Sequence, residues 1–358
     1  MNWAHPDTLP WRALATGARL WQTERVKRRI VLIVAAAVFV AGIAAFFAFG
    51  ARGTQPQAAL PNPNGYDDFE TATSWLVKWN GDLLGKSPEE IRIALNQNVK
   101  ALELVHDGLR KESAVPVRND MNWFNQHMAR VGQHKSMAQL LVGEGLIHLH
   151  EGRTNEAARS FANCIVFAHA AHRSGLMIDE LVGIACQAIG AKRLVQVAPD
   201  ITADVLREIL SELIALDQER EPAAAILQRD WEWSRGAYGL LRSSLMKIAM
   251  RKSLQDAGTM FEKKHARSVA ALRLVMTELA VRGYTAKNGK PPTSLAELVP
   301  AWLPAVPPDP FSSRPLIYRV IATNTFLLYS VGPDGIDDQG AALNRGETET
   351  GDLLPTAL

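Results

Sequence analysis

The segment FLLYSVGPDGIDDQG, residues 326–340, gathers three aspartates and three glycines behind an apolar run. Asp334, Asp337 and Asp338 place three carboxylates within five residues, where they repel one another unless a cation or solvent intervenes. Calcium takes about six to eight oxygen ligands, and glycines let a loop turn its carbonyls inward. The spacing is not that of an EF-hand, since Arg345 stands at the twelfth position. A calcium loop and a solvated acidic turn both remain open.

Histidines are the other residues that could carry chemistry. His127, His134 and His148 are separated by multiples of seven residues and share one face if a single helix carries them. A zinc site needs three or four converging ligands, and the H-E-x-x-H pattern of zinc proteases is absent from the sequence. We expect hydrogen-bonded structural histidines, with a zinc-dependent envelope hydrolase as the alternative. Nearby groups spaced too loosely to form a motif are His169, His172, Asp179 and Glu180.

No other pattern in the sequence is typical of an enzyme. It contains neither a glycine-rich phosphate loop nor a nucleophile elbow. Cys164 and Cys186 lie 22 residues apart and fit no zinc spacing. They are interpreted as two buried free thiols, with a disulfide between neighbouring helices as the alternative. We therefore predict no catalytic residues and no organic cofactor.

The charge is distributed unevenly along the 358 residues. Residues 1–29 have a net charge of +4, so the remaining residues must sum to −2 for the whole chain to reach +2. A nucleic-acid-binding domain needs clustered lysine and arginine on its folded part. The mildly acidic body therefore argues against a nucleic-acid partner.

Residues 30–50, IVLIVAAAVFVAGIAAFFAFG, contain no charged or polar side chain. A helix of this length just covers the ~30 Å hydrocarbon layer of a membrane. Basic residues cluster before the segment and Arg52 alone follows it closely, which predicts a cytoplasmic N-terminus. We expect a retained anchor in the inner membrane of a bacterium, with periplasmic domains; a cleaved signal or a buried soluble helix are the alternatives. Residues 51–65 are predicted to be a flexible linker.

Residues 66–264 show helical periodicity almost throughout, which predicts an all-α ectodomain. In residues 87–109, Ser87 and Glu90 form a capping box ahead of an apolar stripe that runs to Leu109. A long helix is predicted over 252–284. Further helices should begin near Met121, Thr154, Met177, Thr202 and Pro222.

Residues 138–168 form a predicted antiparallel helix pair that partly resembles a tetratricopeptide unit. Gly145, Ala157 and Phe161 stand where that repeat has small, small and aromatic residues, whereas His148 and Cys164 depart from it. No second copy occurs at the expected period. A generic helix pair and a peptide-binding repeat both remain open.

Residues 265–340 have a different pattern, which predicts a small α+β module. A helix is followed by the Asn288-Gly289 turn and by a short helix with Ser294 as its cap. Two strands over 315–321 and 325–331 then form a half-buried hairpin with alternating apolar residues. Residues 341–358 are predicted to be a flexible tail.

The pieces NGKPPTSL, DPFSSRPLIY and YSVGPDGIDD occur in order in this module, which resembles the globular domain of the major pseudopilin of type II secretion systems. In that family the last acidic loop binds calcium, which implies Ser330, Asp334, Asp337 and Asp338 as ligands here. The long basic N-terminus lacks the processing site of a pseudopilin, so neither processing nor polymerisation is expected. The whole chain resembles uncharacterised single-pass bacterial membrane proteins that carry this module.

Together these features predict a single-pass membrane protein of the cell envelope with a scaffolding or partner-binding role. The resemblance implies a place beside secretion or pilus-type machinery, with an envelope protein as the unidentified partner. Calcium would fix the last loop structurally rather than take part in catalysis. The alternatives are a tetratricopeptide-like peptide-binding module and the zinc-dependent hydrolase described above.

Overall fold

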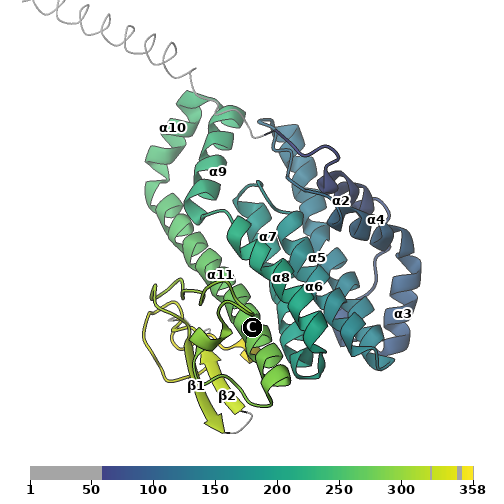
Figure 1. Ribbon diagram of the computed structural model, residues 1–358. Helices are drawn as coiled ribbons and strands as arrows, with labels where there is room; N and C mark the ends of the chain where they lie inside the picture. Colours follow the sequence, from purple (N-terminus) through teal and green to yellow (C-terminus); the bar gives the residue numbers. More distant parts are fainter. Residues whose placement is uncertain (1–58, 323–324, 345–348, 358) are drawn as a thin grey trace, which may run out of the picture. The chain divides into compact units, whose positions relative to one another are not determined.

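The computed structural model describes residues 59–322, 325–344 and 349–357, which are mainly α-helical with one small β-hairpin (Figure 1). The prediction of a mainly α-helical chain with a small β-hairpin is confirmed for this part of the chain. The predicted cytoplasmic segment 1–29, the transmembrane helix 30–50 and the first half of the linker 51–65 lie outside the described residues.

Ten α-helices occur in the described part. The helix starts predicted at Met121, Thr154 and Met177 are confirmed, and Thr202 and Pro222 are the N-caps of the two helices that follow. The helices are α2 (Gly65–Thr73), α3 (Pro88–Gln97), α4 (Val99–Leu109), α5 (Met121–His150), α6 (Thr154–Ala170), α7 (Met177–Val197), α8 (Ala203–Glu219), α9 (Ala223–Tyr238), α10 (Leu240–Ala249) and α11 (Arg251–Asn288).

The predicted helix over residues 87–109 begins as expected but is interrupted. Ser87 and Glu90 form the predicted capping box at the start of α3. The helix then breaks at Asn98, whose side chain accepts a hydrogen bond from the Val77 amide at 2.8 Å and donates to the Val77 carbonyl at 3.1 Å. An asparagine that binds backbone outside its own helix competes with helical hydrogen bonding. The single apolar stripe is therefore split between α3 and α4.

Helices α5, α6 and α7 follow one another as antiparallel hairpins in the centre of the bundle (Figure 1). Gly145 on α5 lies against the buried ring of Phe161 on α6, and a Cβ added at Gly145 would stand 2.7 Å from Phe161 Cδ1. The predicted pairing of a small with an aromatic residue is thus present. Close approach of the two helices depends on it.

The two thiols are buried and free, as predicted. Cys164 Sγ lies 3.6 Å from the Ala138 carbonyl and 3.4 Å from the Cys186 carbonyl, which places it between α5 and α7. Burial raises the pKa of Cys186 to about 12. Neither thiol is a reactive nucleophile in this environment.

Helix α11 packs along both α7 and α8. His265 Nδ1 of α11 donates to Glu180 Oε1 of α7 at 2.9 Å, and Arg220, just after α8, lies 3.5 Å from the same oxygen. Burial raises the pKa of Glu180, but the hydrogen bond from His265 and the charge of Arg220 outweigh it and lower the pKa overall. A helix from late in the chain that covers two earlier ones departs from the neighbour-only stacking of repeat proteins.

Among the described residues, the segment Met177–Asp200, formed by α7 and the short turn after it, is long and apolar enough to cross a membrane by length and composition. Half of its most apolar stretch is buried inside the bundle, where α7 packs against α5, α6 and α11. A core helix of this kind passes the same composition test.

The C-terminal module begins on the second half of α11, so the predicted boundary between residues 264 and 265 falls inside a continuous helix. The strands are β1 (Ile317–Ala322) and β2 (Thr325–Tyr329), paired antiparallel. The predicted alternation of buried residues is wrong for β1, whose last four residues are all exposed. That end of the hairpin extends past the end of α11, so no helix covers it (Figure 1).

The short helix of the module is a 3-10 turn, Leu295–Leu298, with Ser294 at the predicted N-cap position. The predicted cap is wrong because Ser294 makes no side-chain hydrogen bond to the turn. Glu297 instead accepts from the Thr293 amide at 2.9 Å and from the Tyr284 hydroxyl at 2.6 Å. The carboxylate therefore ties this turn to the end of α11.

The predicted flexible tail, residues 341–358, is wrong for its described part. Ser330 and Leu353 exchange backbone hydrogen bonds of 2.9 and 3.0 Å, so the tail lies beside the end of β2. Asp352 and Leu353 are buried. The module thus extends beyond residue 340, and residues 59–358 form one compact unit.

Candidate functional site

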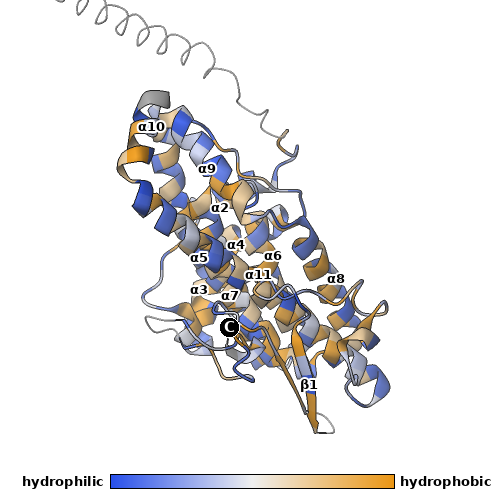
Figure 2. Ribbon diagram, turned by 90° about the vertical axis from the view of Figure 1, so that its left-hand side faces the viewer, coloured by the Kyte–Doolittle hydropathy of each residue, from blue (hydrophilic) through white to orange (hydrophobic). Residues whose placement is uncertain are grey.

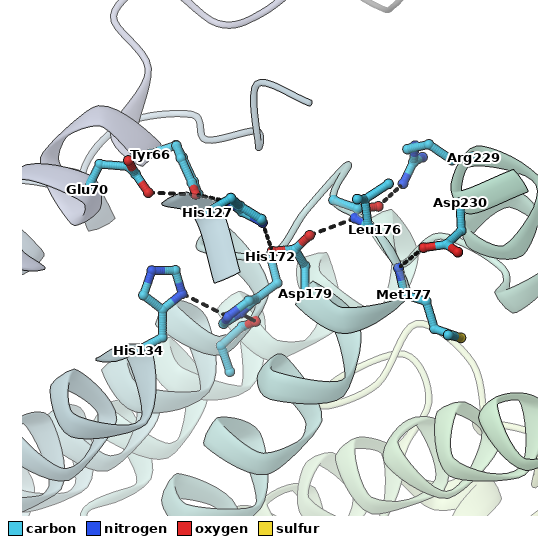
Figure 3. Close-up of polar contacts among 12 residues, drawn as sticks. Tyr66, Glu70, His127, His134, His172, Leu176, Met177, Asp179, Arg229 and Asp230 are labelled. Carbon is cyan, nitrogen blue, oxygen red and sulfur yellow. Dashed lines mark hydrogen bonds and ion pairs between the residues drawn. The ribbon is translucent and has the colours of Figure 1, made fainter. Parts of the chain in front are cut away.

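A buried polar cluster lies where α2, α5 and the start of α7 meet (Figure 3). Because α5 is unbroken, His127 and His134 stand two turns apart on one face, as their spacing predicts. His172 follows the end of α6 and Asp179 lies in the first turn of α7. The short connection between these helices brings both residues to the histidine face of α5.

His127 and Asp179 form the centre of the cluster. His127 Nε2 donates to Asp179 Oδ1 at 2.7 Å, and the side chains are only 2% and 0% exposed. Asp179 Oδ2 accepts from the Leu176 amide at 2.7 Å, which caps the start of α7. Trp123 stacks on the imidazole with ring centroids 4.6 Å apart. A buried carboxylate is tolerated when it is paired and hydrogen-bonded in this way.

Tyr66 joins this pair to an ion pair nearer the surface. Its hydroxyl lies 2.9 Å from Glu70 Oε1 and 3.1 Å from His127 Nδ1, and Glu70 also pairs with Arg130. The hydroxyl donates to Glu70 and lies beside His127, so it connects the buried pair to this ion pair. Burial and the charge of Glu70 raise the pKa of Tyr66, which keeps the phenol protonated.

His134 and His172 form a second, neutral pair. His172 Nδ1 donates to the Ala168 carbonyl at 2.8 Å, so its Nε2 accepts from His134 Nδ1 at 3.0 Å. Burial lowers the pKa of His134 well below its usual range and lowers that of His172. His134 Nε2 is buried and has no hydrogen-bond partner within the described structure. The pair is held in its uncharged form.

The histidine set of the zinc hypothesis does not converge. His127 is paired with Asp179 and His134 with His172, whereas the buried Nδ1 of His148 has no hydrogen-bond partner within the described part of the chain. Burial lowers the pKa of nearby His169 to about 4. No group of three or more histidine, cysteine, aspartate or glutamate side chains in the described ranges is arranged to hold a metal ion. Sequence spacing found the shared face, but it set Asp179 aside because its spacing from His169 and His172 is too loose for a motif. The partner of Asp179 is His127, 52 residues earlier in the sequence.

The predicted calcium residues point to different partners. Ser330 Oγ donates to Asp309 Oδ1 at 3.0 Å. Asp334 accepts from the amides of Ile336 and Gly351, at 3.2 and 3.1 Å. These oxygens are thus occupied by donors within the protein.

The other two predicted ligands also fail to face a common point. Asp337 Oδ1 accepts from the Tyr329 hydroxyl at 2.8 Å and from the Gln339 amide at 2.9 Å. These hydrogen bonds lower the pKa of Asp337. Asp338 is exposed. Among the described residues these side chains do not form a group that could hold a metal ion in this arrangement, and the calcium loop stays a prediction.

Two carboxylates that sequence reasoning missed hold the loop instead. Asp309 is 1% exposed, and its Oδ2 accepts from the Val331 amide at 2.9 Å. Asp352, fully buried in the tail, accepts from the Gly340 amide at 2.7 Å. Burial raises the pKa of Asp352. The aspartate before a proline in DPF signals a local turn, but nothing local reveals that Asp309 also binds residues 21 positions away.

An open hollow of about 320 Å³ lies between α3, the end of α5 and α7. Its wall is mainly apolar, and its rim carries basic or imidazole side chains from three elements. Lys86 is paired with Glu90 at 3.0 Å, whereas no carboxylate within the described ranges pairs with Arg193. We call this hollow the basic groove; its lining residues are Leu84, Lys86, Pro88, Ile91, Leu146, Leu149, His150 and Arg193.

Comparison with known proteins gave no match to a family model, to a curated protein or to a solved structure. The resemblance of the C-terminal module to a pseudopilin domain therefore stays a prediction from its motifs.

Proposed function

We propose that this protein is a single-pass, membrane-anchored component of the bacterial envelope that binds a partner protein rather than catalysing a reaction. The observation that carries the partner-binding role is the basic groove, where apolar and cationic side chains meet on an open surface. The polar cluster around His127 is sealed by Trp123 and Tyr66, which supports a structural role for it. The inner-membrane location rests on the apolar segment 30–50.

The chemistry of the groove favours an acidic partner segment with an apolar side chain. Leu149 is 39% exposed and offers apolar contact, and Arg193 offers a guanidinium that no carboxylate within the described ranges neutralises. Arginine binds carboxylates through two parallel hydrogen bonds, which adds specificity as well as affinity. Such a site suits a scaffold that holds one acidic peptide segment. Its association with secretion or pilus-type machinery rests on the motif resemblance of the module.

The alternative of a tetratricopeptide-like module uses the same surface but differs in packing. The close contact of Gly145 with Phe161 favours it. The position of α11 across α7 and α8 favours a closed bundle. In either case the partner segment would bind along α5.

A charge-swap experiment in cells tests the groove. A photo-crosslinking amino acid at position 149 in the full-length chain should capture a partner, and Arg193→Glu should abolish the adduct. A matching Glu→Arg or Asp→Arg change in the captured segment should restore it. The control is the same crosslinker at exposed Ile93, which does not line the groove. Equal adducts at both positions, or no rescue by the charge swap, would rule out the proposed groove.

A further inference from the structure

The hairpin formed by α9 with α10 and α11 carries an exposed apolar face at its tip. The chain turns at Gly239, where φ is +77°, and α10 then runs back beside α9. Ser243 is buried, whereas Leu245 and Ile248 are 66% and 75% exposed on the opposite face of α10. The exposed apolar side chains continue to Leu254 on α11. Figure 1 shows this tip extending beyond the neighbouring helices.

The same tip is strongly basic. Residues 235–255 contain five basic residues and no acidic one, although residues 59–358 as a whole have a net charge of −3. None of the five forms an ion pair with a carboxylate within the described ranges. Figure 2 shows the apolar and charged residues side by side on α10. We call this the basic tip, with the cations Arg235, Arg242, Lys247, Arg251 and Lys252.

The basic tip lies at the end of the unit where the described chain begins. Asn64 exchanges hydrogen bonds of 2.9 and 3.0 Å with Ala114, and the short irregular segment that follows leads to Arg118. The Arg118 carbonyl accepts from Trp233 Nε1 of α9 at 3.0 Å. Residues 114–118 therefore link the start of the unit to the second half of α9.

The apolar segment ends at residue 50 and the described chain begins at residue 59. Eight residues between them span at most about 29 Å when fully extended. If residues 30–50 cross a membrane, residue 59 at the start of the unit is kept within that distance of its surface. The tether is therefore short enough for a part of the unit to contact lipid.

Resting on the membrane anchoring proposed above, we infer that the basic tip docks on the anionic lipid surface of the membrane that holds the anchor. Leucine and isoleucine side chains insert at the boundary between headgroups and acyl chains, while flanking lysine and arginine attract anionic headgroups. Ile248, near the end of α10, and Lys252, in the first turn of α11, are both exposed on either side of the break at Met250. The anchor and the tip together fix the orientation of the ectodomain.

A second copy of the chain fits the tip less well. An isologous contact between two tips would bring ten positive charges together without a carboxylate to neutralise them, and like charges across an interface are costly. An anionic lipid surface complements the same charges at many positions.

The test uses the full-length chain in lipid nanodiscs, with an environment-sensitive fluorophore on Ile248→Cys. Cys164 and Cys186 are buried, and the labelled wild-type chain gives their background. In discs with equal phosphatidylcholine and phosphatidylglycerol, the label should be quenched by lipid-attached quenchers. The matched control is Ile321→Cys on β1, which is 65% exposed but lies by the opposite end of α11, where Arg282 covers Phe326 of the hairpin.

Neutralising the charges should weaken docking by a predictable amount. Each basic residue near an anionic surface contributes about 1 kcal/mol, or about fivefold. The double variant Arg251→Gln, Lys252→Gln should therefore lower the ratio of docked to free label about 25-fold. No quenching at position 248 in anionic discs, or equal quenching at position 321, would overturn the inference. A label response in lipid-free detergent that depends on protein concentration would also overturn the inference, because it would indicate contact between two copies of the chain.

The anchor is tested separately by extracting the unlabelled chain from cell membranes with alkaline carbonate. Release would contradict the proposed single-pass anchor, whereas quenching at position 248 reports contact of the tip with lipid and can succeed or fail independently.

Discussion

His127 Nε2 lies 2.7 Å from Asp179 Oδ1, and this buried pair joins two helices whose residues are 52 positions apart. The second oxygen of Asp179 caps the first turn of α7, so one carboxylate fixes both a tertiary contact and a helix start. Through Tyr66 the same pair reaches α2. The resemblance to a catalytic His–Asp couple is limited to these two residues, because the nitrogen facing away from Asp179 meets a phenol and not a nucleophile.

We predict that Asp179→Ala strongly destabilises the protein. The change removes the partner of a buried imidazole and leaves the Leu176 amide without its cap, and breaking a buried pair from one side typically costs about 3–5 kcal/mol. Urea unfolding of residues 51–358, which include the whole described unit, measures the loss. Asp107→Ala, at an exposed pair with Arg110, is the matched control and should change the free energy by less than about 0.5 kcal/mol. Similar losses in the two variants would show that the cluster is not important for folding.

Stability should fall as the pH drops below about 6.5. Burial lowers the folded-state pKa of His134, His169 and His172, so the unfolded chain binds more protons than the folded one below the ordinary histidine pKa. Each of these histidines lowers the free energy of unfolding by up to ~1.4 kcal/mol for each pH unit of acidification. His106 opposes this trend, since its hydrogen bond to Glu144 raises its pKa.

Mutation can show how much the buried pair of His134 and His172 contributes to this pH dependence of the unfolding free energy. In His134→Phe the unfolding free energy should depend less steeply on pH between about 6.5 and 5, because one proton-binding group of the unfolded chain is gone. His150→Gln, at an exposed position of the same helix, serves as the comparison. An unchanged slope in His134→Phe would contradict the prediction.

The contact between α5 and α6 predicts the effect of adding a methyl group. Gly145→Ala should destabilise the protein by about 1–3 kcal/mol, because the new Cβ would overlap the buried Phe161 ring. Phe161→Leu in the same chain should recover part of this loss, as the smaller side chain makes room. Gly132→Ala, also on α5 but with open space around its Cβ, should be neutral or slightly stabilising. Strict additivity of Gly145→Ala and Phe161→Leu would show that the two residues do not interact.

Local rules in the sequence predicted much of the helical scaffold. The Ser87–Glu90 capping box depends on residues three apart, and the shared face of His127 and His134 follows from helical geometry. Asn98 shows where such rules stop, since its side chain leaves the helix to bind Val77, a partner that periodicity does not reveal. A helix boundary that depends on a distant partner of one side chain cannot be predicted from local rules, because that partner is known only from the packed structure.

The partners in the candidate site depend on connections between helices. Asp179 reaches His127 only because the turn after α6 returns the chain to α5. In the C-terminal module, Asp352 binds the Gly340 amide from a tail that reads as polar and aperiodic. A polar residue in a loop gives the same local signal whether solvent or a buried amide is its partner.

The last prediction concerns calcium. Asp309→Ala should destabilise the module by about 2–4 kcal/mol, to the same extent with calcium and with chelator, because it leaves the buried Ser330 hydroxyl and Val331 amide without an acceptor. Thermal unfolding of residues 51–358 in both conditions measures this, with exposed Asp338→Ala as a near-neutral control. A ligand that binds only the folded state must raise its stability. If calcium instead raises the melting temperature of the wild-type chain, and Asp334→Ala removes the rise, the carboxylates of the loop rearrange around the ion and the hydrogen-bonded arrangement described here is its calcium-free form.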